Sequence, residues 1–437
     1  MSEEAFWKVN PDLFSNLKIR ASYGSLGNGN VSPYSFLELL SISTSGRVLN
    51  GLKNKYTSAP AVMPDGLTWE TATTTDVGLD FGMLNNRLQF NGDYYIRKTT
   101  DMYTVGETLP DVFGASSPKG NYADMTTKGW EITLTWRDQF TLAEKPFNYE
   151  IRGTLSDYIS TIDRYNNQTG NLDDYYAGKR VGEIWGYVTE GLFKDQADID
   201  SHADQTLIQS SSKRITYPGD VKIKDLNGDH VIDYGNNTVD DHGDKTVIGN
   251  ALPRYAYSIN LSGDWNNFFL SAFFQGVGKQ DWYPSSECIF WGQYNRPYNN
   301  MPTWHQGNYW TEDNTDAYLP RYAGYNASLK STPQTRYLQN VAYIRLKNLQ
   351  FGYTLPQPIV SKAKLQNVRV YISAENLWCW SPLYKHTRDL DVTNIYGSDP
   401  DLTDADMSSG LNGNRGSGDG NSYPQMKSVS LGLSVTF

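Results

Sequence analysis

Hydrophobic and polar residues alternate along much of the chain. At the C-terminus Val429, Leu431 and Leu433 occupy one set of alternate positions, and serine, glycine and threonine occupy the other. The same period of two recurs in residues 88–97, 130–137, 149–155 and 368–373. Because successive side chains of a β-strand point to opposite faces, this pattern predicts strands with one apolar and one polar face.

The length of these segments favours strands that cross a membrane. We count about a dozen of them, several about 9 to 11 residues long, which is enough to span a bilayer at a tilt and exceeds the usual strand length in globular sheets. Aromatic residues near the predicted strand ends suit the headgroup level: Trp69, Tyr94, Tyr95, Trp130, Trp136, Tyr255, Tyr257, Trp265 and Trp378. A soluble β-sandwich also alternates and uses aromatic residues, so this alternative stays open at this point.

The connections between the predicted strands are of two kinds. Leu84 to Arg87 and Trp265 to Asn267 suit tight turns. The long connections, which are rich in Gly, Asn, Asp and Tyr, cover about 98–128, 159–252, 277–340 and 377–426, and within the last one Ser408 to Ser422 has the composition of a mobile loop. Short turns on one rim and long loops on the other are typical of an outer-membrane barrel. The sequence thus predicts an all-β, antiparallel transmembrane β-barrel segment with short periplasmic turns and long extracellular loops.

Composition excludes several other classes. The 437 residues include 38 Lys+Arg and 48 Asp+Glu, which gives a net charge of −10 and argues against a nucleic-acid partner. No apolar run approaches the ~18 residues of a transmembrane helix, and the N-terminus lacks the pattern of a signal peptide. The two cysteines and five histidines form no metal-type spacing. No group of residues indicates a nucleophile or catalytic metal, so we expect no enzyme.

One loop resembles a calcium-binding loop. Carboxylate and amide oxygens recur at positions 1, 3, 5 and 9, and hard cations need such convergent oxygen ligands. The candidate ligands are Asp225, Asn227, Asp229, the carbonyl of Val231, and Asp233, with Asp240, Asp241 or Asp244 available to complete the shell. His230 replaces the usual glycine at position 6, and Asn236 replaces the glutamate at position 12. The alternative is a turn whose carboxylates bind their own backbone.

Aromatic residues are also dense between Asp281 and Tyr325. Ring faces stack on sugar C–H faces, and neighbouring amides and carboxylates bind hydroxyl groups. The candidate substrate-binding residues are Trp282, Tyr283, Trp291, Trp304 and Trp310. The alternative is that these rings pack the loops against one another or against a partner protein.

Several sequence blocks, in order and at consistent spacing, resemble the C-terminal part of a SusC/RagA-like TonB-dependent outer-membrane transporter. The blocks are Leu17 to Gly29, Leu67 to Leu84, Asn121 to Leu134, Gly182 to Phe193 (GEIWGYVTEGLF), Pro218 to Asp233 (PGDVKIKDLNGDHVID), Thr246 to Pro253, Tyr343 to Pro356 (YIRLKNLQFGYTLP) and Ser422 to Phe437. They extend over nearly the whole chain.

This resemblance implies a barrel of about 22 strands in the outer membrane of a Gram-negative bacterium. Such a barrel is closed by an N-terminal plug, imports oligosaccharides or peptides with energy from TonB, and works with a SusD-like surface lipoprotein. We prefer oligosaccharides because of the loop aromatics. The resemblance also places Asp244 last in the calcium loop, and it makes Phe437 the signal read by the barrel-assembly machinery.

We expect residues 1–437 to be a fragment or truncated product that lacks the signal peptide, TonB box, plug and first strands. Its polar strand faces should line the lumen, with Gln89, Asp93, Arg97, Glu131, Arg137, Arg369 and Glu375 as examples, and their apolar partners should face outer-membrane lipids. The alternatives are a secreted all-β carbohydrate-binding module or glycoside hydrolase, and a passive porin. Apolar residues pointing outward would favour a membrane protein, whereas a packed apolar core would favour a soluble domain.

Overall fold

The computed structural model describes most of the chain. The described residues are 10, 13–29, 37, 40–58, 62, 66–106, 112, 117–209, 215–285, 288–294, 299–323, 332–393, 395 and 424–437. The predicted mobile loop at Ser408 to Ser422 lies outside them.

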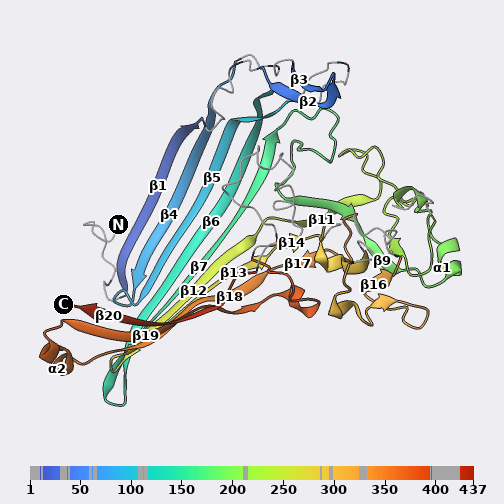
Figure 1. The fold of residues 1–437 in the computed structure, drawn as a ribbon. Coiled ribbons are helices and arrows are strands. Elements are labelled where there is room, and N and C mark those ends of the chain that lie inside the picture. Colours follow the sequence, from blue (N-terminus) through green and yellow to red (C-terminus); the bar gives the residue numbers. More distant parts are fainter. Residues whose placement is uncertain are drawn as a thin grey trace.

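A ten-stranded antiparallel sheet dominates the fold (Figure 1). From one edge to the other it contains β1 (Phe14–Asn28), β4 (Glu70–Met83), β5 (Leu88–Val105), β6 (Lys119–Leu142), β7 (Lys145–Arg164), β12 (Arg254–Trp265), β13 (Phe268–Lys279), β18 (Tyr343–Thr354), β19 (Asn367–Trp380) and β20 (Ser428–Thr436). The order follows the chain without crossovers, and the sheet curves strongly along its width (Figure 1). This is the all-β meander that the alternation predicts.

Shorter elements occupy the connections. Two-stranded pairs are formed by β2 (Ile42–Leu49) with β3 (Leu52–Thr57), β8 (Glu183–Tyr187) with β11 (Lys245–Asn250), β9 (Thr189–Leu192) with β10 (Val221–Ile223), β14 (Asp281–Trp282) with β17 (Gln339–Asn340), and β15 (Tyr309–Trp310) with β16 (Leu319–Arg321). The helices among the described residues are α1 (Gln196–Asp200), α2 (Gln357–Val360), and the 3₁₀ helices η2 (Thr206–Ile208), η3 (Ile289–Tyr294), η4 (Thr303–His305), η6 (Ser361–Ala363) and η7 (Pro382–Lys385). Within the described ranges, no helix has the length and apolar character needed to cross a membrane.

The two ends of the large sheet differ in their connections. At one end, tight turns join β6 to β7 and β12 to β13. Asn266 and Asn267 have φ angles of 48° and 70°, the left-handed geometry that a two-residue hairpin turn requires and that asparagine tolerates. At the other end, long connections leave the sheet after β1, β7, β13 and β19. The predicted division into short and long rims is confirmed.

The strands β5 and β6 are longer than the sequence suggested. Residues 98–128 were expected to form a loop, but the ladder continues through Thr99 and Met125 and ends only at Val105 and Lys119. Within 98–128 the side chains no longer alternate between apolar and polar. Backbone hydrogen bonds nevertheless hold β5 and β6 together in this part of the ladder. Side-chain pattern therefore underestimated strand length, which reaches 24 residues in β6.

One face of the large sheet is apolar and uncovered. The register places apolar residues opposite one another: Ile372 of β19, for example, lies opposite both Phe351 and Leu431. Each of the ten strands presents at least one exposed large apolar side chain on this face, among them Ile19, Val77, Tyr94, Leu134, Ile151, Leu261, Leu270, Phe351, Ile372 and Leu431, with exposed fractions of 38% to 79%. Monomeric soluble proteins rarely expose so large a contiguous apolar surface. The arrangement favours contact with lipid over the soluble alternative.

The main apolar core lies outside the sheet. It is built from the described residues of the long connections at 165–253, 280–342 and 381–395, which together we call the loop body (Figure 1). Its fully buried side chains include Tyr187, Ile223, Trp282, Trp291, Leu319, Tyr337 and Leu383. Residues that are distant in sequence thus meet in one packed cluster beside the long-connection end of the sheet.

Candidate functional site

The polar face of the large sheet carries paired charges. Asp93 of β5 lies opposite Glu131 of β6, and two like charges in that arrangement destabilise a sheet. Arg20 of β1 offsets them: its guanidinium donates to Asp93 Oδ2 at 3.0 Å and to Asp80 Oδ2 at 2.8 Å. A charged surface of this kind suits a water-filled interior and is unsuited to lipid.

The residues predicted to line the lumen all belong to this polar face. Their opposite neighbours are polar residues or glycine: Gln89 faces Thr135, Arg97 faces Thr127, Arg137 faces Glu150, Arg369 faces Ser434, and Glu375 faces Ser428. Arg137 and Glu150 also form an ion pair. The register confirms that these side chains share one face, opposite the apolar one.

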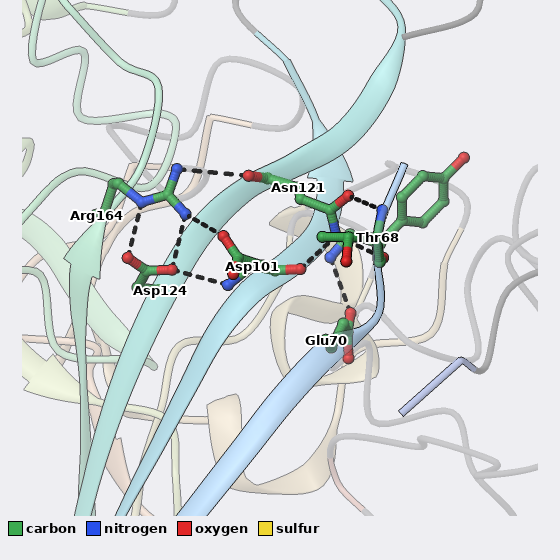
Figure 2. Close-up of polar contacts among 7 residues, drawn as sticks. Thr68, Glu70, Asp101, Asn121, Asp124 and Arg164 are labelled. Atoms are coloured by element: carbon green, nitrogen blue, oxygen red, sulfur yellow. Dashed lines mark hydrogen bonds and ion pairs between the residues drawn. The ribbon is translucent and has the colours of Figure 1, made fainter. Parts of the chain in front are cut away.

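At the long-connection end of the sheet, six residues form an outer cluster: Thr68, Glu70, Asp101, Asn121, Asp124 and Arg164 (Figure 2). Arg164 of β7 binds Asp124 of β6 through both Nε and Nη2, at 2.7 and 2.8 Å. Its Nη2 also donates to Asp101 Oδ1 at 3.1 Å. One guanidinium therefore ties together β5, β6 and β7.

The outer cluster also replaces missing ladder bonds. Asp101 has a φ of 56° and lies where the register of β5 and β6 shifts. Its backbone N–H donates to Asp124 Oδ1 at 2.9 Å, and its carbonyl accepts from Asn121 Nδ2 at 2.5 Å. Asn121 Nδ2 reaches the Thr68 carbonyl as well, at 3.0 Å (Figure 2). Side chains thereby satisfy a β-bulge that would otherwise leave two backbone groups unpaired.

Buried ion pairs fix the loop body. Arg321 Nε donates to Asp220 Oδ1 at 2.7 Å, and burial raises the pKa of this carboxyl despite the arginine. Arg345 of β18 reaches Asp391 of the last connection, with Nη2 2.6 Å from Oδ1. Removing one member of such a pair leaves a buried charge uncompensated. The second pair fastens the loop body to the sheet.

The candidate calcium loop folds as a compact turn. Asp225 accepts backbone N–H groups of Gly228 and His230 at 2.6 and 2.9 Å, and these bonds, that of Gly228 first, hold its pKa below the usual range. His230 has a φ of 66°, so the sharp turn forms without the expected glycine. Asp244 is fully buried and accepts the N–H groups of Leu226 and Asp233 at 2.7 and 3.0 Å.

These contacts are those of the backbone-bonding alternative. Among the described residues, no group of three or more His, Cys, Asp or Glu side chains converges as a metal site. The candidate set also relies on Asn227 and on the carbonyl of Val231, and an ionised carboxylate retains acceptor capacity after one hydrogen bond. Calcium binding by this loop stays a prediction.

The five candidate substrate-binding aromatics differ in exposure. Trp282 and Trp291 have no exposed surface, and Trp291 packs edge-on against Phe290 and Tyr337. In this conformation the two indoles hold the loops together, as the alternative proposed. Tyr283, Trp304 and Trp310 are partly buried and pack against the same core. They stay candidates for ligand contact.

The terminal Phe437 is 82% exposed, and its suggested role in assembly stays a prediction. Sequence reasoning did not identify the outer cluster or the Arg345–Asp391 pair. The bonded pairs Arg164–Asp124 and Arg345–Asp391 each join residues that are tens of positions apart, and no local motif marks them.

The chain is similar in sequence to proteins of one kind, the TonB-dependent receptors. No protein-family model matches the chain. The chain is 29% identical to TonB-dependent receptor P3 of Formosa agariphila, over the whole chain and 41% of the relative. It is 23% identical to TonB-dependent receptor SusC of Bacteroides thetaiotaomicron, over the whole chain and 39% of that protein. The chain therefore spans about two fifths of the length of these relatives.

Solved structures share the fold. A structure of the RagAB peptide importer in the open-open state matches 99% of this chain and 41% of its own, with a TM-score of 0.67 and 18% identity. The resemblance to SusC/RagA-like TonB-dependent transporters is thus confirmed, and the barrel fold with it. These relatives are receptors and transporters, which agrees with the expectation that the chain is not an enzyme.

Proposed function

We propose that this chain, a homologue of the C-terminal part of TonB-dependent receptors, forms part of the barrel wall of an outer-membrane importer. The importer would take up oligosaccharides across the outer membrane of a Gram-negative bacterium. The polar face of the sheet would border the transport path, and the loop body would contact ligand at the cell surface.

One observation carries the proposal: an uncovered apolar face extends across all ten strands, opposite a charged face. A bilayer stabilises such an apolar face, because lipid replaces the water that would otherwise contact it. Long connections gather at one end of the strands and tight turns at the other, as in outer-membrane barrels.

The open edges of the sheet indicate what must pair with it. β1 and β20 have one hydrogen-bonded neighbour each among the described strands, and an open edge is costly in hydrocarbon. We propose that further strands close the barrel, that TonB supplies energy through a plug, and that a SusD-like lipoprotein covers the loop body. Phe437 would present the barrel to the assembly machinery.

Uptake assays test the proposal. Cells that depend on the receptor carrying this chain would be given a library of fluorescent oligosaccharides and, separately, of fluorescent peptides. We expect oligosaccharide accumulation that disappears when the receptor or TonB is deleted. Accumulation unchanged by deletion of the receptor would contradict import, and accumulation that survives loss of TonB alone would indicate a passive porin.

Peptide import is the second candidate. Two observations favour it: one solved structure with the same fold is that of the RagAB peptide importer, and Trp282 and Trp291 are too buried to stack on a sugar. Selective loss of peptide accumulation in the same assay would replace the oligosaccharide proposal.

We further propose that the Asp225 to Asp244 loop binds calcium. The oxygens of Asp225, Asn227, Asp229, Val231 and Asp233 would supply ligands, with Asp244 bracing the loop backbone. Chelation should then speed proteolysis within 225–244, and Asp229→Asn should reproduce that effect without chelator. Asp313→Asn, at an exposed aspartate of the loop body outside residues 225–244, serves as the matched control. Cleavage at the same rate with and without chelator would contradict calcium binding.

A further inference from the structure

A polar cavity lies where β18 and β19 meet the last long connection. Its volume is about 260 Å³, and the residues that line it include Arg345, Asn376, Tyr384, Arg388, Asp391 and Lys427. Three of these side chains are cationic and one is anionic. The cavity lies at the outer end of the sheet, beside the loop body that the proposed function places at the cell surface.

The single carboxylate in the cavity is already fully engaged. Asp391 binds Arg345 and also accepts hydrogen bonds from the backbone N–H groups of Gln425 and Thr393, at 2.8 and 3.0 Å. The Thr393 hydroxyl adds a fourth bond at 2.7 Å. Arg388 and Lys427, by contrast, form no ion pair within the described part of the chain. Among the described residues, the positive charges of Arg388 and Lys427 at the cavity are therefore uncompensated.

Two buried polar atoms at the cavity have no partner. Arg345 is 4% exposed and its Nε, a donor, is unbonded. The Oδ1 of Asn376, an acceptor, is also unbonded, while Nδ2 of the same amide donates to the Met426 carbonyl at 3.1 Å and so fixes its orientation. Buried polar groups without partners are uncommon and call for a ligand or solvent to satisfy them.

Backbone strain holds Asn376 in this place. The residue has a φ of 52°, and the register between β18 and β19 shifts between Leu346 and Asn348, directly opposite it. Such bulges re-aim side chains and are frequent beside binding sites. Here the bulge brings the amide to the cavity together with Arg388 and Lys427.

From this geometry we propose that the cavity binds a carboxylate of the ligand, with an adjacent hydroxyl or amino group donating to Asn376. Arg388 and Lys427 supply the countercharge, and Arg345 Nε donates to a carboxylate oxygen. A cation would be repelled, and a neutral sugar would leave the positive charge uncompensated. The role of this site rests on the proposed function. The receptor would select acidic oligosaccharides, or acidic peptides if it imports peptides.

Calorimetric titration of the receptor carrying this chain tests the site without requiring transport. The probes are glucuronate, its neutral counterpart glucose, and glutamate. We expect glucuronate to bind and glucose to give no signal at the same concentrations. Tighter binding of glutamate than of glucuronate would assign the carboxylate to a peptide.

The matched variants are Arg388→Gln and Lys385→Gln. Both remove one exposed positive charge near η7, but only Arg388 lines the cavity. Neither side chain is ion-paired in the described structure, but the Arg388 guanidinium lies over the Tyr384 ring, 5.2 Å from its centroid. An unchanged melting temperature of Arg388→Gln is therefore the control for folding. Arg388→Gln should weaken glucuronate binding by about tenfold, the effect of losing one charge-assisted hydrogen bond.

The carboxylate site would be contradicted if neither acid binds or if glucose binds as well as glucuronate. Equal glucuronate affinity of the two variants would contradict it as well. Failure of import with intact glucuronate binding would instead contradict the proposed function alone.

Discussion

The large sheet and the loop body use apolar residues in opposite ways. In the sheet, Leu431 and its neighbours form an outer surface exposed to the surroundings, and the polar residues face the other side. In the loop body, Trp282, Trp291 and Tyr337 are fully buried, and polar residues cover them. In the proposed function, lipid supplies the apolar contacts of the sheet, whereas the loop body contains its own core.

This difference predicts that the two regions fail independently. A change that damages the aromatic core should loosen the loops and spare the sheet. A charge on the apolar face should prevent membrane assembly of the sheet. It should leave the core of the loop body intact, because the loop body holds no part of that face.

The largest effect is expected from Trp291→Ala. Removing a fully buried indole should cost about 3 to 5 kcal/mol and expose the loop body to protease, while the strands stay protected. Limited proteolysis of the assembled receptor measures both at once. Ile289→Ala, two residues away and 45% exposed in the wild type, is the control and should have little effect. Loss of strand protection in Trp291→Ala would show that the two regions are coupled.

The next effect concerns the apolar face. Leu431→Arg should cost ~2 to 4 kcal/mol near the bilayer midplane and reduce the amount of assembled barrel. Ser430→Arg places the same charge on the polar face of the same strand and should be tolerated. Heat-modifiable migration on gels reports assembly of each variant. Equal tolerance of both would show that the faces are wrongly assigned.

A smaller effect is expected from pH and should be confined to the loop body. His305 is buried and donates Nε2–H to the Phe290 carbonyl at 2.9 Å, which leaves the unprotonated Nδ1 buried without a hydrogen-bond partner. Burial lowers the pKa of His305 to about 4, against about 6.5 in an unfolded chain. The unfolded state therefore takes up a proton first, and stability is lost as the pH falls from about 6.5 to 4.

This loss should reach up to about 3 kcal/mol for the loop body. Protease sensitivity of the loops, followed between pH 7 and 4.5, measures it. His305→Gln retains a donor for Phe290 and removes the titrating group, so its loops should respond less to acid. The same acid response in wild type and variant would assign the effect to other residues.

The strands of the sheet were predictable from the sequence because alternation and turn residues depend only on neighbouring positions. Alternation places Leu431 and Ser430 on opposite faces regardless of the rest of the chain, and Asn266-Asn267 marks a turn by its own conformational preference. The extension of β5 and β6 was missed because backbone pairing continues where side-chain alternation stops.

The loop body was harder to predict because its contacts are non-local. Whether Trp291 contacts ligand or packs inside depends on Tyr337, which follows it by dozens of residues, and no period in the sequence connects the two. The bulge at Asn376 likewise indicates a binding site only because the fold brings Arg388 and Lys427 to the same cavity. The sequence identified the aromatic residues as important but left open which function they serve.

The apolar face of the large sheet should contact lipid, and spin labels on β20 test this contact most directly. Labels at Leu431→Cys and Ser430→Cys, in a receptor carrying Cys379→Ser, would be compared in membranes for collision with oxygen and with a water-soluble nickel complex. We predict that the ratio of oxygen to nickel collisions is high at 431 and low at 430, and alternates along residues 428–435. Equal ratios at the two positions, or a higher ratio at 430, would contradict the account.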